Sequence, residues 1–151
     1  MLKLSKKLLC SLEAILDIAY NAGFDPVQSK DITRRQGIPE RYLEQVLQSL
    51  VRAKILKGVR GPRGGYRLAR ERRRITVGEI ARVVYASEPD EEIVTILTQS
   101  NLGRDVVFPF WEAFEEDVMT RLDGTSLEDL CRSARERGIT PAGPVNMDFS
   151  I

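Results

Sequence analysis

Histidine is absent from this 151-residue sequence, and cysteine occurs only twice, as Cys10 and Cys131. Without histidine the commonest general acid and base is missing. No nucleophile–base or metal-ligand spacing replaces it, so we expect no enzyme, no metal and no cofactor. The two cysteines lie far apart and outside any CxxC or Cys/His pattern, which argues against a zinc site or a disulfide framework and predicts two free thiols in helices.

Long apolar runs are also missing. No stretch of the sequence approaches the length of a membrane span. The first seven residues lack the apolar segment and cleavage site of a signal peptide. We therefore expect a soluble, cytoplasmic protein with no membrane partner. The composition, 42% hydrophobic and 30% charged, fits one compact domain or a small domain with an appended interaction element.

The net charge of +1 conceals a segregation of charge along the chain. Residues 1–75 hold 17 Lys/Arg against 7 Asp/Glu, whereas residues 76–151 hold 6 against 15. The N-terminal part therefore carries a net charge of +10, which indicates that it binds a polyanion. The C-terminal part carries a net charge of −9, which indicates a different role.

A basic, glycine-rich turn at Arg60–Leu68 is the most informative segment of the sequence about function. Pro62 fixes φ for a turn, Gly64 and Gly65 permit positive φ, and the flanking residues have strand character, so a β-hairpin is predicted. A nucleotide phosphate loop does not fit, because no apolar strand runs into the turn and no helix opens from it. The hairpin is typical of a wing that contacts DNA, and its candidate residues are Arg60, Arg63 and Arg67 at the tip, with Gly64 and Tyr66.

Upstream of the wing, the residue spacing predicts two helices joined by a short turn. Ser29 is the expected N-cap of the first, which Gly37 closes. Pro39 begins the second, which extends to about Ala53 with an apolar back formed by Leu43, Val46, Leu47 and Leu50. This is a helix-turn-helix, whose second helix lies in the major groove. The candidates for base readout are Arg41, Tyr42, Glu44 and Gln45.

Further helices surround this unit. A core-facing helix is expected from Ser5 to about Ala22, and a capped helix from Thr76 to about Tyr85 should pack under the winged helix. The basic run between wing and capped helix predicts weak phosphate contacts; it consists of Arg70, Arg72, Arg73 and Arg74. Residues 87–101 indicate a boundary segment that is partly helical around Ile93 to Leu97.

An aromatic stripe at helical spacing dominates the C-terminal half. Such a stripe needs a partner surface, so we interpret it as a dimerisation helix. The alternative, packing on the same subunit, stays open and is compatible with the first. Pro109 either begins or kinks this helix. The stripe comprises Val107, Phe110, Trp111, Phe114, Val118 and Leu122.

The expected fold is therefore mainly α, a winged helix-turn-helix domain with a small β-hairpin wing plus a long C-terminal dimerisation helix. The DNA-binding domain is placed at 1–86, and the linker and dimerisation helices at 87–137. Within the latter, a capping box at residues 125–128 starts a last helix that ends at about Glu136. A flexible tail is expected at 138–151.

The segments 35–45 and 59–68, the capped helix at Thr76, the Trp111 helix and the motif 125–130 together closely resemble the Rrf2 family of bacterial transcription regulators, which includes the IscR-like proteins. The resemblance extends from about residue 4 to 130. It implies a homodimer with a winged helix-turn-helix in each subunit and a long crossing helix, bound to a palindromic operator. By motif position, Arg41, Glu44 and Gln45 would read bases in the major groove, while Arg60 and the wing enter the minor groove.

At the positions of the family's cluster ligands, this sequence has different residues. Cluster-binding relatives carry three cysteines before the tryptophan helix, sometimes with a histidine or an N-terminal carboxylate. The corresponding positions here are Ile93, Gln99, Asp105, Phe108 and, in the first helix, Leu9. Since iron–sulfur clusters need thiolates, with imidazole the usual substitute, we expect no cluster. A cluster bridging two subunits through Cys10 or Cys131 is the alternative.

The sequence thus predicts a dimeric, sequence-specific regulator, a repressor that binds double-stranded operator DNA and responds to a signal other than an intrinsic iron–sulfur cluster. That signal is a thiol modification at Cys10 or Cys131, a small ligand or a protein partner. A second hypothesis is a protein-interaction module, in which the acidic C-terminal half docks a metabolic enzyme or another regulator.

Overall fold

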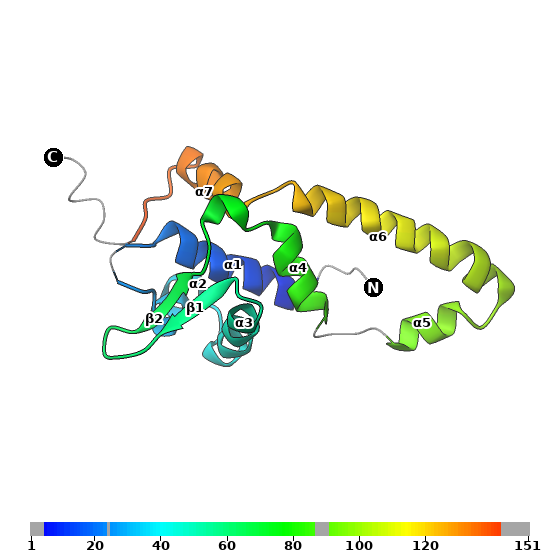
Figure 1. The fold of residues 1–151 in the computed structure, drawn as a ribbon, viewed down its shortest axis with the longest axis horizontal. Coiled ribbons are helices and arrows are strands. Elements are labelled where there is room, and N and C mark those ends of the chain that lie inside the picture. The colour runs from blue at the N-terminus through cyan, green and yellow to red at the C-terminus, as the bar shows by residue number, and fades with distance from the viewer. Residues whose placement is uncertain (1–4, 24, 87–90, 143–151) are drawn as a thin grey trace.

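A computed structural model describes residues 5–23, 25–86 and 91–142 of the chain (Figure 1). Helices dominate, and the two strands form one antiparallel sheet, which confirms the predicted fold class. The elements, in order, are α1 (Lys6–Tyr20), α2 (Ser29–Gln36), α3 (Glu40–Arg52), β1 (Leu56–Val59), β2 (Gly65–Leu68), η1 (Arg72–Arg74), α4 (Val77–Ala86), α5 (Glu91–Leu97), η2 (Gly103–Val107), α6 (Phe108–Asp123) and α7 (Leu127–Glu136).

Helices α1 to α4, the hairpin and α7 share one hydrophobic core, and we call this part the body. The apolar back of α3 is buried as predicted, and α4 packs on α1 and α3. Helix α7 contributes Leu127 and Cys131, both 0% exposed, to the same core. The predicted domain division at residue 86 stays a prediction. In the structure, α7 packs against α1 and η1, which both precede residue 86.

Helix ends follow local capping rules, with two shifts from the predicted positions. Ser5 caps α1 by accepting a hydrogen bond from the Leu8 backbone N–H, 3.0 Å away. Helix α2 already includes Ser29, and Gln28 occupies its N-cap position without a side-chain bond. Ser126, rather than Thr125, caps α7 in a reciprocal capping box with Asp129. The expected capping carboxylate, Glu128, is instead engaged by arginines.

A buried ion pair joins α1 to the helix-turn-helix. The Asp17 side chain is fully buried and accepts two hydrogen bonds from the Arg35 guanidinium, at 2.7 and 2.9 Å. The Gln36 amide donates a third, at 2.8 Å. The hydrogen bond to Asp17 raises the pKa of Arg35, outweighing the opposing effect of burial. This contact fixes the C-terminal end of α2 against the last turn of α1.

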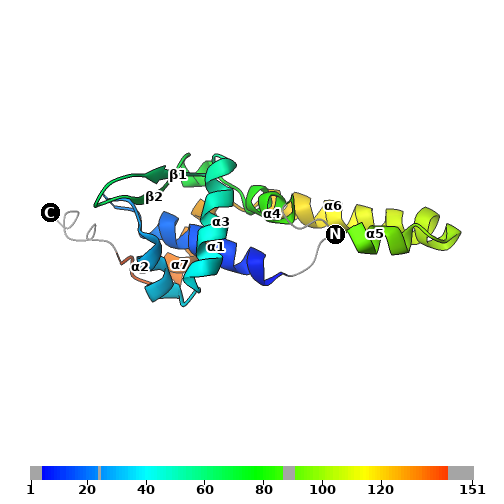
Figure 2. The same cartoon turned by 90° about the horizontal axis from the view of Figure 1, so that it is seen from below.

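Elements α5, η2 and α6 form an arm that projects from the body (Figures 1 and 2). Its inner end packs on α4, and Met119 and Leu122 contact the core there. None of the α6 side chains is fully buried. Pro109 lies in the first turn of α6, which continues without a break in helical backbone from the wider π-helical turn η2. Helix α5 coincides with the helical part of the predicted boundary segment, of which residues 87–90 lie outside the described residues.

The described start of the predicted tail contacts α1. The Tyr20 hydroxyl donates to the Ile139 carbonyl, and the Ala142 N–H donates to the Asn21 side chain at 2.7 Å. Residues 143–151 of that tail lie outside the described residues. Within the part of the chain that the structure covers, no helix is long and apolar enough to cross a membrane.

Candidate nucleic-acid interface

Helix α3 presents a polar face to solvent over its buried apolar back. All four predicted readout residues, Arg41, Tyr42, Glu44 and Gln45, are exposed on it. Gln48 and Arg52 continue the same face toward the end of the helix. An exposed helix face with guanidinium, amide and carboxylate groups has the donors and acceptors that distinguish base pairs in the major groove.

The hairpin forms as predicted, with β1 paired antiparallel to β2. Its turn is closed by a hydrogen bond of 2.9 Å from Gly64 N–H to the Gly61 carbonyl. The predicted roles of the glycines were wrong, because the positive φ belongs to Gly61, at 112°. Gly64 and Gly65 are needed instead for close approach: a Cβ on either would lie 2.2 and 2.4 Å from the carbonyl oxygens of Val59 and Val27.

Only part of the predicted wing tip lies at the tip. Arg60 and Arg63 are exposed in the turn, whereas Arg67 lies within β2, opposite Lys57. The Arg67 guanidinium donates to the Gly23 carbonyl at 3.3 Å, which holds the hairpin against the segment after α1. Tyr66 serves the same purpose through its backbone, which is hydrogen bonded in both directions to Val27. DNA contacts by Gly64, Tyr66 and Arg67 stay predictions.

The basic run after the wing is largely neutralised within the chain. Arg70 pairs with Glu79 at 3.0 Å, Arg72 with Glu128, and Arg73 with Glu71. Glu79 belongs to α4 and Glu128 to α7, so the residues adjacent to the basic run in the sequence did not predict these ion pairs. The predicted weak phosphate contact of this run therefore depends mainly on Arg74.

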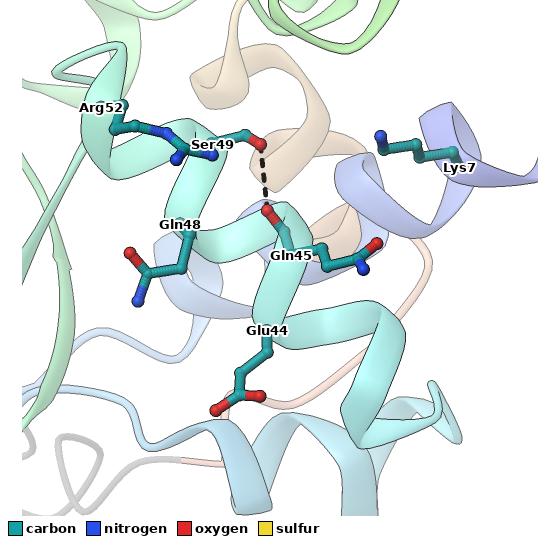
Figure 3. A pocket seen from close by; sticks show the side chains of 6 residues that line it. All are labelled: Lys7, Glu44, Gln45, Gln48, Ser49 and Arg52. Atoms are coloured by element: carbon teal, nitrogen blue, oxygen red, sulfur yellow. Dashed lines mark hydrogen bonds between the residues drawn. The ribbon is translucent and has the colours of Figure 1, made fainter. Parts of the chain in front are cut away.

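A groove between α1 and α3 adds residues that sequence reasoning did not assign to the site. Its volume is about 560 Å³, and Lys7 from α1 faces Gln45 and Ser49 across it (Figure 3). The neighbouring Lys6 places its ammonium 5.7 Å from the centre of the Tyr42 ring, a cation–π distance. We call this feature the α1–α3 groove; it is lined by Lys7, Glu44, Gln45, Gln48, Ser49 and Arg52.

The predicted dimerisation stripe divides into two parts. At the inner end of α6, Leu122 packs on the body, as the same-subunit alternative required. Farther out, Val107, Phe110 and Phe114 are 46%, 69% and 45% exposed. Trp111 packs on Phe114 at 5.0 Å between ring centres. Its indole N–H is buried without an acceptor among the described residues.

An exposed helix of a helix-turn-helix beside a basic β-hairpin defines a winged helix-turn-helix DNA-binding protein. The comparison with known families agrees. The family described as Rrf2, iron-dependent transcriptional regulator, matches residues 4–133. The chain belongs to the Rrf2 family and is a DNA-binding transcriptional regulator.

Relatives of known name support this assignment. The chain is 33% identical over 137 residues to the HTH-type transcriptional regulator IscR of Xenorhabdus nematophila, covering 87% of this chain and 80% of that protein. It is 32% identical to CymR of Bacillus subtilis, with 85% and 89% covered. The solved structure of T. potens IscR is similar over 90% of each chain, with 37% identity and a TM-score of 0.72. These relatives are named as regulators, not as enzymes.

The family description mentions iron, but the residues of this chain do not fit an iron–sulfur cluster. The positions corresponding to the ligands hold a single carboxylate, Asp105, which is paired with Arg104. Cys131 lies in the core, and its burial raises the pKa of its thiol. The positive charge of the nearby Arg72 lowers this pKa, but by less than burial raises it. Cys10 packs half-buried against the same core. Across the described residues, no group of three or more acidic or cysteine side chains is arranged to hold a metal.

Both thiols are free and lie on helices, as predicted. Because a thiolate is the reactive form, the buried Cys131 is a poor site for thiol sensing. Cys10 is the more accessible of the two.

Proposed function

We propose that this protein is a homodimeric repressor that binds a palindromic operator through α3 and the wing, and that it responds to a signal without an intrinsic iron–sulfur cluster. Each subunit reads one half-site. The two half-sites are separated by about one turn of DNA, roughly 34 Å, as in other dimeric helix-turn-helix proteins. Repression follows because the operator is occupied until the signal is received.

The exposed polar face of α3 carries the proposal. Arg41, Glu44 and Gln45 are exposed over a buried back, which is the arrangement that a base-reading helix requires. Arg60 and Arg63 extend the positive surface at the wing tip. Phosphate contacts by the wing would supply affinity, and base contacts by α3 would supply specificity.

The uncovered outer part of α6 supports the dimer. Exposed aromatic side chains on a helix that projects from its own body are suited to pack against the same helix of a second copy. A second copy would also bury the outer apolar residues of the arm and offer an acceptor environment to Trp111. Such a two-fold arrangement matches the symmetry of a palindrome.

Selection of genomic DNA fragments by the purified full chain tests the function. Wild-type protein should enrich a palindrome and form a dimer, and it should repress transcription from a promoter that contains the palindrome. Glu44→Ala should mainly relax base preference, whereas Arg60→Ala should weaken binding to many sequences by about tenfold. If neither change altered operator affinity, the docking through α3 and the wing would be wrong.

The iron content and the visible spectrum of protein purified without oxygen complete the test. A colourless, iron-free dimer that binds the palindrome is expected. A brown, iron-containing sample would contradict the cluster-independent response.

The alternative, a protein-docking module, is less well supported. Several carboxylates of the acidic C-terminal half are paired within the chain, including Asp105 with Arg104, Asp123 with Arg82, and Asp129 with Arg132. These pairs reduce the charge available to a partner.

A further inference from the structure

The first turn of α1 carries two lysines and no acidic residue. Positive side chains at this end of a helix are unfavourable, because the helix dipole places partial positive charge there as well. The Ser5 side chain and the Leu8 N–H satisfy one another, so the turn is well formed despite this charge. The charge is therefore held in a defined position on the surface.

That position is beside the face of α3. Lys6 lies at the Tyr42 ring, and Lys7 faces the middle of α3 across the α1–α3 groove (Figure 3). Arg52 stands at the far end of the same groove. The residues that line the groove thus include two cations, Lys7 and Arg52, and one carboxylate, that of Glu44.

The wing and the first turn of α1 lie on opposite sides of α3. Figure 2 shows the hairpin to one side of α3 and the N-terminal end of α1 to the other. A helix that enters the major groove is bordered by a phosphate backbone on each side. If the wing approaches one side, the first turn of α1 is the nearest element to the other.

We infer that Lys6 and Lys7 bind DNA phosphates on the side of α3 opposite the wing, so that α1 is a third DNA-contacting element beside α3 and the wing. This inference rests on the proposed function. Lys6 contacts phosphate from above the Tyr42 ring and thereby fixes that ring beside the bases. Lys7 binds at the mouth of the α1–α3 groove, with Arg52 at its other end.

Phosphate contacts have a characteristic dependence on salt. Each contact contributes about 0.9 to the slope of log K against log salt concentration, or about eightfold in affinity at 0.1 M salt. Two lysines in each subunit of a dimer make four contacts. The Lys6→Ala/Lys7→Ala variant should therefore lower the magnitude of the slope by about 3.6, while the preferred operator sequence stays the same.

The experiment measures operator affinity of the full-length dimer from 50 to 300 mM salt. Lys6→Arg/Lys7→Arg keeps both charges and should retain nearly the wild-type slope. The matched control is Arg121→Ala/Arg137→Ala, which removes two charges on the side of α6 and α7, across the body from α3 (Figure 1). Because these elements lie on the opposite side of α1 from α3, loss of the two charges should leave the slope unchanged.

Operators with single methylphosphonate groups locate the contacts. Neutralising the phosphates on the side away from the wing should weaken wild-type binding by about eightfold per contact and leave the Lys6→Ala/Lys7→Ala variant unaffected. Circular dichroism and sedimentation establish that each variant is a folded dimer.

An unchanged slope in the double alanine variant would overturn the inference while the proposed function stands. A loss of affinity with the slope preserved would also overturn it, because the lysines would then act only by supporting Tyr42. If wild-type protein selected no operator, the proposed function itself would fail, and the inference with it.

Discussion

The body and the arm contain similar apolar residues but differ in what covers them. In the body, Ile15, Leu47 and Ile80 are 0% exposed. In the arm, Leu102 and Phe110 are 73% and 69% exposed. The body thus buries its apolar side chains within one chain, whereas the arm leaves large apolar side chains exposed to solvent.

This difference separates folding from assembly. Burial of apolar area stabilises the body by about 25 cal/mol for each Å² removed from water, and no second chain is needed for it. The same free energy is available to the arm only when another surface covers it. Substitutions in the two regions should consequently act on different equilibria, unfolding in one and association in the other.

The largest effect is expected from Asp17→Ala in the body. Loss of the buried carboxylate leaves the partly buried Arg35 guanidinium without its partner, so the free energy of unfolding should fall by about 3 kcal/mol. Urea unfolding followed by circular dichroism measures this fall. The matched change in the arm, Asp105→Ala, removes an exposed ion pair and should leave the free energy of unfolding almost unchanged. An equal loss of stability in the two variants would contradict the difference between the body and the arm.

Next comes Phe110→Glu in the arm. A charge at the centre of an apolar interface should weaken the dimer by about 30-fold or more, because aromatic residues there contribute about 2 kcal/mol or more. Sedimentation measures the association. The monomer should unfold as before, since this side chain is largely in solvent. Glu112→Gln, also exposed on α6, is the control and should associate normally. A dimer that tolerated Phe110→Glu would place the interface elsewhere.

A smaller effect is expected where α7 joins the body. Ser126→Ala removes the side-chain cap on the Asp129 N–H and should lower the free energy of unfolding by about 1 kcal/mol. Ser126→Asn should retain most of the stability, because asparagine caps helices about as well as serine. Thermal unfolding of the three proteins distinguishes these outcomes, and equal loss in both variants would rule out the capping explanation.

The smallest effect concerns pH. Burial alone would raise the pKa of Glu128, but the hydrogen bond from Arg135 and the charge of Arg72 together bring it below its usual value. A carboxyl group whose pKa is lowered by folding stabilises the folded state above its ordinary pKa, and this contribution is lost as pH falls through the lower, folded value. The unfolding temperature should therefore decline from about pH 4.5 downward, and less steeply in Glu128→Gln. An equal decline in the variant would show that Glu128 does not contribute.

Much of the body was predictable because its signals are local. Apolar spacing identified the back of α3, and Gly37 ends α2 in the left-handed conformation that glycine adopts most readily. Where prediction failed, the deciding partner was distant in sequence. Gly65 is required by the backbone at Val27, and the charge of Arg72 is met by Glu128 from α7.

The candidate site shows the same division. Spacing along one helix was enough to predict that Arg41, Glu44 and Gln45 lie exposed on the face of α3 opposite its buried back. It could not reveal Lys6, because the ring that Lys6 contacts belongs to a helix more than thirty residues away. For the arm, the sequence indicated an apolar stripe, but the share of it that packs on the same chain depends on where α6 meets α4.

The wing also sets limits on how this regulator can change over evolutionary time. Its strand β2 is hydrogen bonded to Val27, and at Gly65 even a methyl group would collide with that backbone. The turn residues Arg60 and Arg63 meet no such restriction. Descendants of this gene can therefore exchange residues at the tip of the wing without disturbing its packing, while the glycine at its base is inherited unchanged.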